Sequence, residues 1–227
     1  MQAKPVVLCI LDGWGLRTSN TGNAPAQAHT PNIDHIMETY PHSTLITHGP
    51  NVGLPKNQMG NSEVGHTNIG AGRIVAMDLG QIDLAIETGA FKKNSALNFF
   101  IEKLKSSGGT AHILSLLSDG GVHGQFSHLI ATLKSLHEHN IPTALHVVAD
   151  GRDVPPKSIV TYLKQLQEQM TPNTFIATLT GRYYAFDRDN RWERVRHAYD
   201  AMVHGSSAQH FESAEKAIYA GYQKNSE

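Results

Sequence analysis

This 227-residue sequence has one cysteine, a net charge close to zero and few long apolar runs. The only cysteine, Cys9, cannot form a disulfide within the chain, which excludes the disulfide-stapled class of secreted scaffold. The longest apolar run near the N-terminus, residues 6–11 (VVLCIL), is too short for the core of a signal peptide or for a membrane-spanning helix. We therefore expect a cytoplasmic protein with no membrane partner.

The formal net charge of −1 gives no overall field that would attract nucleic acid or an anionic membrane. The sequence also lacks internal repeats and low-complexity tracts. Its hydrophobic content of 40% and charged content of 17% are those of an ordinary soluble globular protein. A chain of this length suffices for one large core or two modest domains.

Four short apolar runs recur, and each ends at a polar turn that usually contains glycine. The runs are residues 5–11 (PVVLCIL), 111–117 (AHILSLL), 144–149 (ALHVVA) and 174–180 (TFIATLT). Continuous apolar runs of this length are typical of strands buried on both faces of a parallel sheet. The pattern also predicts that Cys9 is a small buried strand residue.

Apolar residues at helical spacing follow or precede these runs and predict four helical core faces. The four stripes are Leu97, Phe100, Ile101 and Leu104; Phe126, Leu129, Ile130, Leu133 and Leu136; Ile159, Leu163, Leu166 and Met170; and Trp192, Val195, Tyr199 and Met202. Alternation of strands and helices predicts an α/β fold with right-handed crossovers. The stretch 72–90 is the expected boundary between an N-terminal portion and a second α/β unit.

Charged and polar side chains stand just past the predicted strand ends, where ligands gather in open parallel sheets. They are Asp12, then Asp119 and His123, then Asp150, Arg152 and Asp153, then Arg182 and Arg188. Five of the eight arginines lie within residues 182–196. Because the arginine fork matches phosphate and carboxylate oxygens, the pattern predicts a small, doubly anionic ligand.

Several of these residues have simpler explanations that the sequence leaves open. Asp12 precedes Gly13, and its role could be limited to shaping a turn. Arg152 and Asp153 could form a surface ion pair. Arg191, Arg194 and Arg196 could lie on a solvated helix face, and the acidic residues between them disfavour nucleic acid. The pairs Asp34–His35 and Asp200–His204 have metal-ligand spacing, but ordinary helical patterns favour structural roles for them.

Ser62 stands among glycines and polar residues in the segment QMGNSEVGHTNIGAGR, residues 58–73. It could cap a helix, or it could begin one and lie at the positive end of the helix dipole. A serine hydroxyl needs a base or a metal to act as a nucleophile. His66, one turn along, is one candidate base; a divalent cation shared with an early carboxylate such as Asp12 is the stronger alternative.

Five motifs in order resemble cofactor-independent phosphoglycerate mutase, a family of the alkaline phosphatase superfamily. They are LDGWG, GLPKNQMGNSEVGHTNIGAGRIV, LLSDGGVHG, ADGRDVPP and GRYYAFDRDNRWERV, and the resemblance runs from residue 6 to about residue 224. It implies a glycolytic and gluconeogenic isomerase that interconverts 3-phosphoglycerate and 2-phosphoglycerate with two divalent ions, Mn²⁺ above all, with Mg²⁺ or Co²⁺ as alternatives. It also implies residues 1–76 as the start of a discontinuous phosphatase-like metal-binding domain, and residues 77–227 as an incomplete inserted phosphotransferase-like domain.

The resemblance also assigns roles to individual residues. Asp12 matches a metal ligand, and Ser62 matches the residue that becomes phosphoserine and touches that metal. The matches to substrate-binding positions are His123, Arg152, Asp153, Arg182 and Arg188. Among these, Asp153 is a candidate for proton transfer at the substrate hydroxyls, and the arginines fix carboxylate and phosphate.

The family continues for several hundred residues beyond the point that matches Glu227, and most metal ligands lie in that part. We therefore expect this chain to be a fragment that is inactive alone, from an enzyme that is monomeric at full length. Two alternatives remain open. The chain could be a non-catalytic phospho-ligand-binding protein, or its parent could be another metal-dependent phosphatase or phosphomutase of the superfamily.

Overall fold

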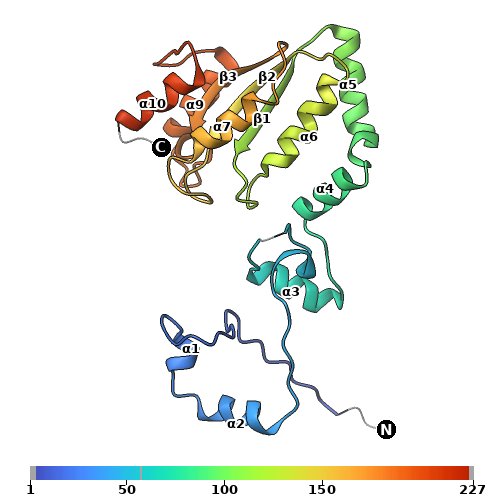
Figure 1. The fold of residues 1–227 in the computed structure, drawn as a ribbon, viewed down its shortest axis with the longest axis vertical. Helices are drawn as coiled ribbons and strands as arrows, with labels where there is room; N and C mark the ends of the chain where they lie inside the picture. The colour runs from blue at the N-terminus through green and yellow to red at the C-terminus, as the bar shows by residue number, and fades with distance from the viewer. Residues whose placement is uncertain (1–3, 57, 225–227) are drawn as a thin grey trace. The chain divides into compact units, whose positions relative to one another are not determined.

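The computed structural model describes residues 4–56 and 58–224 (Figure 1). The chain divides into two compact units, Met1–Val75 and Ala76–Glu227, and each is described by itself. Along the described parts of the chain, none of the helices has the length and apolar character needed to cross a membrane.

The first unit consists of short helices joined by long loops. The helices are α1 (Ala24–Gln27), α2 (Pro31–Thr39), the 3-10 helix η1 (Gly49–Val52) and α3 (Ser62–Ala71). Leu54 and Val64 are the large apolar side chains buried among its described residues. Two such side chains make a very small core.

The strand predicted for residues 6–11 does not form in this structure. These residues have no regular secondary structure, and Val6 and Val7 are 93% and 89% exposed. Cys9 is exposed as well, so its predicted burial in a strand is also wrong. The physical reason is that a strand needs a hydrogen-bonding neighbour, and the described residues of the first unit contain no strand to pair with it.

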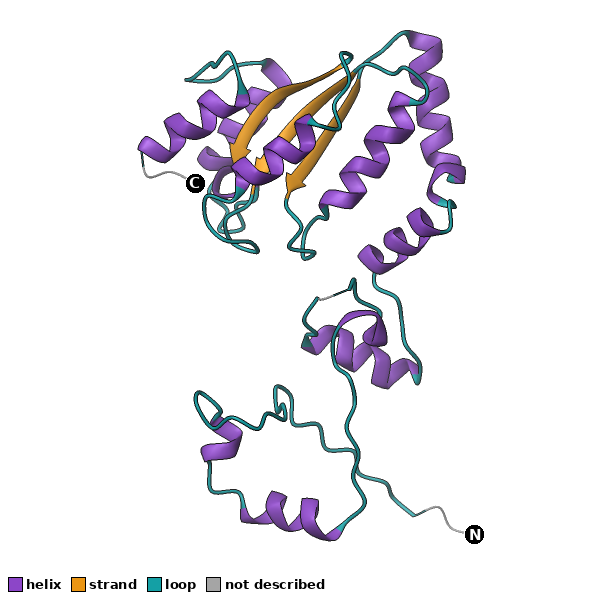
Figure 2. Cartoon of the chain, viewed as in Figure 1, coloured by secondary structure: helices purple, strands orange, loops and turns teal. Residues whose placement is uncertain are grey.

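The second unit is built on a parallel sheet of three strands, which confirms the other three predicted strands and the α/β class. The strands are β1 (Ala111–Leu117), β2 (Thr143–Ala149) and β3 (Thr174–Gly181), in the order β1-β2-β3. The register pairs Leu117 with Ala149, and Ala149 with Gly181. The three strands therefore end level with one another, so the loops that follow them begin along one edge (Figure 2).

Helices precede, connect and follow the strands. They are α4 (Asp78–Glu87), the 3-10 helix η2 (Phe91–Lys93), α5 (Ser95–Ser107), α6 (Phe126–His137), α7 (Ile159–Gln167), α8 (Arg182–Ala185), α9 (Trp192–His204) and α10 (Ala214–Gln223). The main core joins β1 and β2 to α6, α7 and α10 through Leu117, Leu129, Leu133, Leu145, Val147, Ile159, Leu163, Leu166 and Ile218.

The predicted core face of the last stripe is wrong in part. Trp192 is 72% exposed and Tyr199 is also exposed, whereas Ala198 is the buried residue of α9. Phe100 of α5 is likewise exposed beside the buried Ile101. A periodic pattern identifies a helix, but the elements packed against the helix decide which side is covered.

Candidate functional site

Ser62 is the first residue of α3 and makes a direct contact with Asp12. The side chain of Asn61 caps the helix by accepting a hydrogen bond from the Val64 backbone N–H at 3.0 Å, so the Ser62 hydroxyl is not needed for capping. That hydroxyl donates to Asp12 Oδ2 at 2.6 Å. Two residues fifty positions apart therefore place their oxygens together at the positive end of a helix.

Backbone geometry brings these two oxygens together. Asp12 does lie in a turn, because the Trp14 N–H donates to the Leu11 carbonyl at 3.1 Å and Gly13 has a φ of +80°. On the other side, a Cβ on Gly60 would lie 1.8 Å from the Thr47 carbonyl oxygen. Only glycine lets the segment before α3 pass Thr47 so closely.

His66 lies on the same face of α3 but is not oriented as a base for Ser62. Its Nδ1 lies 2.8 Å from the Ser62 carbonyl oxygen and 3.2 Å from Ser62 Oγ. Because a carbonyl oxygen only accepts hydrogen bonds, the shorter contact requires a hydrogen on Nδ1. That nitrogen then cannot accept the hydroxyl proton of Ser62. The proton is directed at Asp12 Oδ2 instead.

Asp12 and Ser62 have the chemistry of a partial site for a hard divalent cation. A carboxylate oxygen and a hydroxyl oxygen 2.6 Å apart, both on exposed side chains, suit Mg²⁺ or Mn²⁺. Such ions take about six oxygen ligands. Over the described ranges, no group of three or more His, Cys, Asp or Glu side chains is placed to hold a metal ion. The two residues therefore fit one side of a coordination shell.

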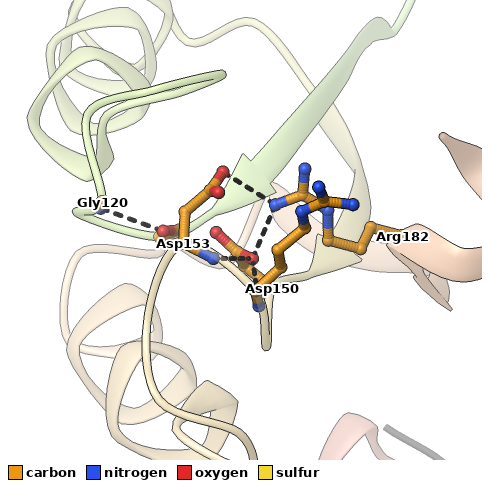
Figure 3. Close-up of polar contacts among 6 residues, drawn as sticks. Gly120, Asp150, Asp153 and Arg182 are labelled. Carbon is orange, nitrogen blue, oxygen red and sulfur yellow. Dashed lines mark hydrogen bonds and ion pairs between the residues drawn. The ribbon is translucent and has the colours of Figure 1, made fainter. Parts of the chain in front are cut away.

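In the second unit, the loop after β2 and the start of α8, which follows β3 directly, meet at a cluster of one arginine and two aspartates (Figure 3). Arg182 Nη1 donates to Asp150 Oδ1 at 2.8 Å and to Asp153 Oδ2 at 2.8 Å. Asp150 Oδ1 also accepts the backbone N–H groups of Arg152 at 3.0 Å and Asp153 at 3.1 Å. The sequence-predicted convergence at the carboxyl ends of the strands is thus confirmed for these residues.

The ionisation of this cluster follows from its contacts. Burial opposes the charge on Asp150, but hydrogen bonds from the Arg152 N–H, Arg182 and the Asp153 N–H hold the pKa of its carboxyl below the usual value. Burial also opposes the charge on Arg182, and the two aspartates keep its pKa above the usual value. The Arg182 guanidinium group therefore lies between two carboxyl groups, and Asp150 and Arg182 are both ionised at neutral pH.

Three other predicted residues, His123, Arg152 and Arg188, are exposed. Asp153 pairs with Arg182, so the alternative of an Arg152–Asp153 surface ion pair is not observed. Within the described part of the chain, neither Arg152 nor Arg188 has a carboxylate within ion-pair distance. These two guanidinium groups are therefore free to meet an external anion.

A second buried carboxylate, Asp187, has a role that the sequence did not reveal. Its Oδ2 accepts the backbone N–H groups of Asp189 at 3.2 Å and Arg191 at 2.8 Å, and its Oδ1 accepts Arg194 Nη1 at 3.1 Å. It anchors the loop that carries Arg188 much as Asp150 anchors the loop that carries Arg152. In both cases the only local signal was an aspartate followed within two to four residues by the backbone N–H groups that it binds.

The loop after β1 has a further anchor that was missed. The Tyr162 hydroxyl of α7 donates to Asp119 Oδ1, in the loop that carries His123. Burial and the Asp119 carboxylate raise the pKa of Tyr162 to about 12. The hydroxyl therefore stays protonated and remains a donor. The loops that carry His123, Arg152 and Arg188 are thus each held by hydrogen bonds to an aspartate within the loop or at its start.

Comparison with known proteins places these residues in a family context. The family described as BPG-independent PGAM N-terminus (iPGM_N) matches residues 82–227. The chain is 59% identical over 219 residues to a 2,3-bisphosphoglycerate-independent phosphoglycerate mutase of Ruegeria sp. (strain TM1040), covering 96% of this chain and 43% of that protein. The proteins of the same name from Roseobacter denitrificans and Ruegeria pomeroyi are 61% and 57% identical, over 89% and 98% of this chain and 40% and 44% of their own length. The chain thus spans about two fifths of the curated relatives that it matches.

Proposed function

Because this chain belongs to the family of BPG-independent PGAM N-terminal regions, we propose that it is the N-terminal portion of a phosphoglycerate mutase, here called the parent enzyme. The parent enzyme would interconvert 3-phosphoglycerate and 2-phosphoglycerate in the cytoplasm as a monomer. The observation that carries the proposal is the 2.6 Å contact between Ser62 Oγ and Asp12 Oδ2 at the start of α3. It gives a phosphoryl-accepting hydroxyl an anionic neighbour at a site where a cation can bind.

The proposal gives the two units different roles. The first unit would be the beginning of a phosphatase-like metal-binding domain of the alkaline phosphatase superfamily, completed by other parts of the parent enzyme. Its exposed apolar residues 6–11 and its very small core support this. The second unit would be the phosphotransferase-like domain, with its strand-end edge holding the glycerate moiety.

Asp12 and Ser62 would hold one of two divalent cations, of which Mn²⁺ is the first candidate and Mg²⁺ or Co²⁺ the alternatives. A bound dication would make a coordinated hydroxyl more acidic and would polarise a phosphoryl oxygen. The chain's own contribution is positional. The hydroxyl hydrogen is directed at Asp12 Oδ2, so the lone pairs of Ser62 Oγ can face a phosphorus atom.

In the first half-reaction, Ser62 Oγ loses its proton and forms a bond to phosphorus as the bond from phosphorus to glycerate O3 breaks, and the released glycerate oxygen gains a proton. In the second, glycerate O2 loses its proton and attacks the same phosphorus, the bond to Ser62 breaks, and the serine oxygen regains a proton. Arg152 and Arg188 would bind the anionic groups, and Asp153 would exchange protons with the substrate hydroxyls. Most of the catalysis is positioning and charge neutralisation.

The experiment is turnover by the parent enzyme carrying Ser62→Ala. Loss of the phosphoryl acceptor is expected to lower kcat by at least about a thousandfold. Ser106→Ala, which removes an exposed hydroxyl that bonds only to its own helix in α5, is the matched control and should leave kcat unchanged. If Ser62→Ala retained kcat within tenfold of the wild type, the proposal would be wrong.

A second candidate is favoured by one observation: among the residues that the structure describes, Arg152 and Arg188 are exposed and have no carboxylate partner. The 227-residue chain by itself could bind a phosphorylated small acid without catalysing any reaction. Calorimetric titration of the chain with 3-phosphoglycerate in the absence of divalent metal tests this. Saturable binding that Arg152→Ala weakens supports it, and a null titration removes it. Analysis of the parent enzyme's products separates a mutase from another phosphatase or phosphomutase.

A further inference from the structure

The side chain at the centre of the strand-end cluster is Asp150, which has no assigned role in the proposed reaction. It follows directly after β2, the central strand, and its side chain is completely buried. A buried carboxylate is costly unless it is paired and hydrogen-bonded. One of its oxygens, Oδ1, accepts three hydrogen bonds, two from the loop after β2 and one from Arg182 at the start of α8. This concentration of donors on one oxygen indicates that Asp150 organises its neighbours.

The first two of these bonds determine the shape of the loop after β2. Because Asp150 Oδ1 accepts the N–H groups of Arg152 and Asp153, the backbone folds back over the carboxylate in an Asx-type turn. The Arg152 side chain then faces solvent, while Asp153 stays partly buried beside Arg182. The turn that Asp150 stabilises therefore directs the side chain of Arg152 toward solvent and that of Asp153 toward Arg182.

The third bond determines where Arg182 lies. Its Nη1 is shared between Asp150 and Asp153, and only 12% of its side chain is exposed. The Asp150 side chain has no exposure, whereas that of Asp153 is 13% exposed, so Asp150 is the more enclosed partner of the two (Figure 3). The Asp153 carboxylate is therefore oriented by Arg182, and Arg182 is oriented by Asp150.

The other side of the turn is closed by the loop after β1. A Cβ on Gly120 would lie 2.9 Å from Asp153 Cβ and 3.1 Å from the Asp153 carbonyl oxygen. The Gly120 N–H itself donates to Ser118 Oγ at 3.0 Å. The turn is thus in contact with a backbone neighbour on one side and bonded to Asp150 on the other, which leaves Asp153 little freedom.

We propose that Asp150 is a positioning residue, which acts through the Arg152–Asp153 turn and through Arg182 to keep the glycerate moiety in place between the two half-reactions. The inference rests on the proposed function. Glycerate must stay bound while it presents its other hydroxyl to phosphoserine. When the groups that hold it are misplaced, water reaches the phosphoserine first: the water oxygen bonds to phosphorus, the Ser62–phosphorus bond breaks, the serine oxygen takes a proton, and inorganic phosphate leaves with glycerate.

The test measures two products from the parent enzyme carrying Asp150→Asn: 2-phosphoglycerate, and inorganic phosphate released from 3-phosphoglycerate. The asparagine keeps an oxygen for the two backbone N–H groups but loses the charge that holds Arg182. We expect the ratio of phosphate to 2-phosphoglycerate to rise at least about tenfold. Unfolding of part of the sample lowers both products equally, so this ratio reports positioning and not stability.

The matched control is Asp83→Asn, which removes the carboxylate that accepts from His128 at 2.7 Å, between α4 and α6 in the same unit. It should leave the ratio unchanged, since neither residue belongs to the strand-end cluster. A ratio for Asp150→Asn equal to that of the control would overturn the proposal. A wild-type parent enzyme that formed no 2-phosphoglycerate would instead contradict the proposed function.

Asp150→Ser provides a second variant if Asp150→Asn does not accumulate as folded protein. Its shorter hydroxyl can still accept one backbone N–H, but it cannot provide charge to Arg182. The same rise in the ratio is expected. An unchanged ratio in this variant would also overturn the proposal.

Discussion

Residues 6–11 and residues 144–149 are two apolar runs of equal length that behave differently in this structure. The first, VVLCIL, is irregular and exposed; the second, ALHVVA, is part of the central strand β2, where Val148 has no exposure. Both have the composition of a buried parallel strand. The difference lies in their neighbours, because β2 has a strand on each side and helices against it. The composition of an apolar run therefore permits a strand, but the strand forms only where neighbouring elements can pair with it and cover it.

The same contrast separates the two groups of site residues. The strand-end cluster of Asp150, Asp153 and Arg182 lies at the end of a sheet that has its own core, and its hydrogen bonds join residues of the second unit to one another. The Asp12–Ser62 pair belongs to a unit with two large buried apolar side chains among its described residues. If the comparison is sound, the second unit should behave as an independent structure and the first should depend on further parts of the parent enzyme.

The largest expected effect concerns catalysis by the 227-residue chain alone. Because Asp12 and Ser62 would supply only part of the proposed shell of about six ligands, kcat/KM for 3-phosphoglycerate with Mn²⁺ should be at least about a thousandfold below that of the parent enzyme. A coupled assay of 2-phosphoglycerate formation measures this. Turnover by the chain within tenfold of the parent would show that the first unit needs no completion.

The next effect concerns stability and compares one leucine from each run. Leu145→Ala in β2 removes a side chain that is 1% exposed and should lower the free energy of unfolding of the chain by about 2–5 kcal/mol. Leu8→Ala removes one that is 70% exposed and should change it by less than about 0.5 kcal/mol. Urea unfolding followed by far-ultraviolet circular dichroism measures both. Equal losses for the two variants would contradict the comparison.

A smaller effect should depend on pH. The pKa of Asp150 is lowered by folding, so its stabilising contribution is complete above the unfolded value, near pH 4, and is lost as the pH falls through the lower folded value. Asp150→Asn should therefore cost about 1–3 kcal/mol in the free energy of unfolding at pH 7, with a smaller difference from wild type at pH 3.

The control for the pH experiment is Asp189→Asn, whose carboxylate is 70% exposed and lies 3.9 Å from Arg194. This variant should stay within about 0.5 kcal/mol of wild type at both pH values. A cost for Asp150→Asn that is the same at pH 3 and pH 7 would separate the role of Asp150 from its charge.

The smallest expected effect concerns the reactivity of Cys9, which should differ little between the native and the unfolded chain. Because Cys9 is exposed in an irregular segment, its rate of reaction with a thiol reagent in the native chain should lie within about threefold of the rate in urea. Peptide mapping of the labelled chain gives both rates. Strong protection in the native chain would indicate that residues 6–11 are covered there, contrary to the structure.

The sequence predicted the three strands of the sheet and the convergence of Asp150, Asp153 and Arg182, because continuous apolar runs and parallel strand ends follow from local pattern and simple geometry. It did not predict the exposure of Trp192 and Tyr199, since helical periodicity does not say which side another element will cover. Nor did it reveal that Asp153 pairs with Arg182, because that pairing depends on how the loop after β2 meets the first residue of α8. The roles of Ser62 and the substrate-binding residues remain predictions.

The two buried carboxylates Asp150 and Asp187 have a consequence for how the strand-end edge can change over time. Each wraps a short loop around itself with backbone hydrogen bonds, and each loop displays an outward arginine, Arg152 or Arg188, whose side chain takes no part in that wrapping. Replacing either arginine should leave its loop in shape. The side chains displayed at this edge can therefore change without loss of the architecture that supports them.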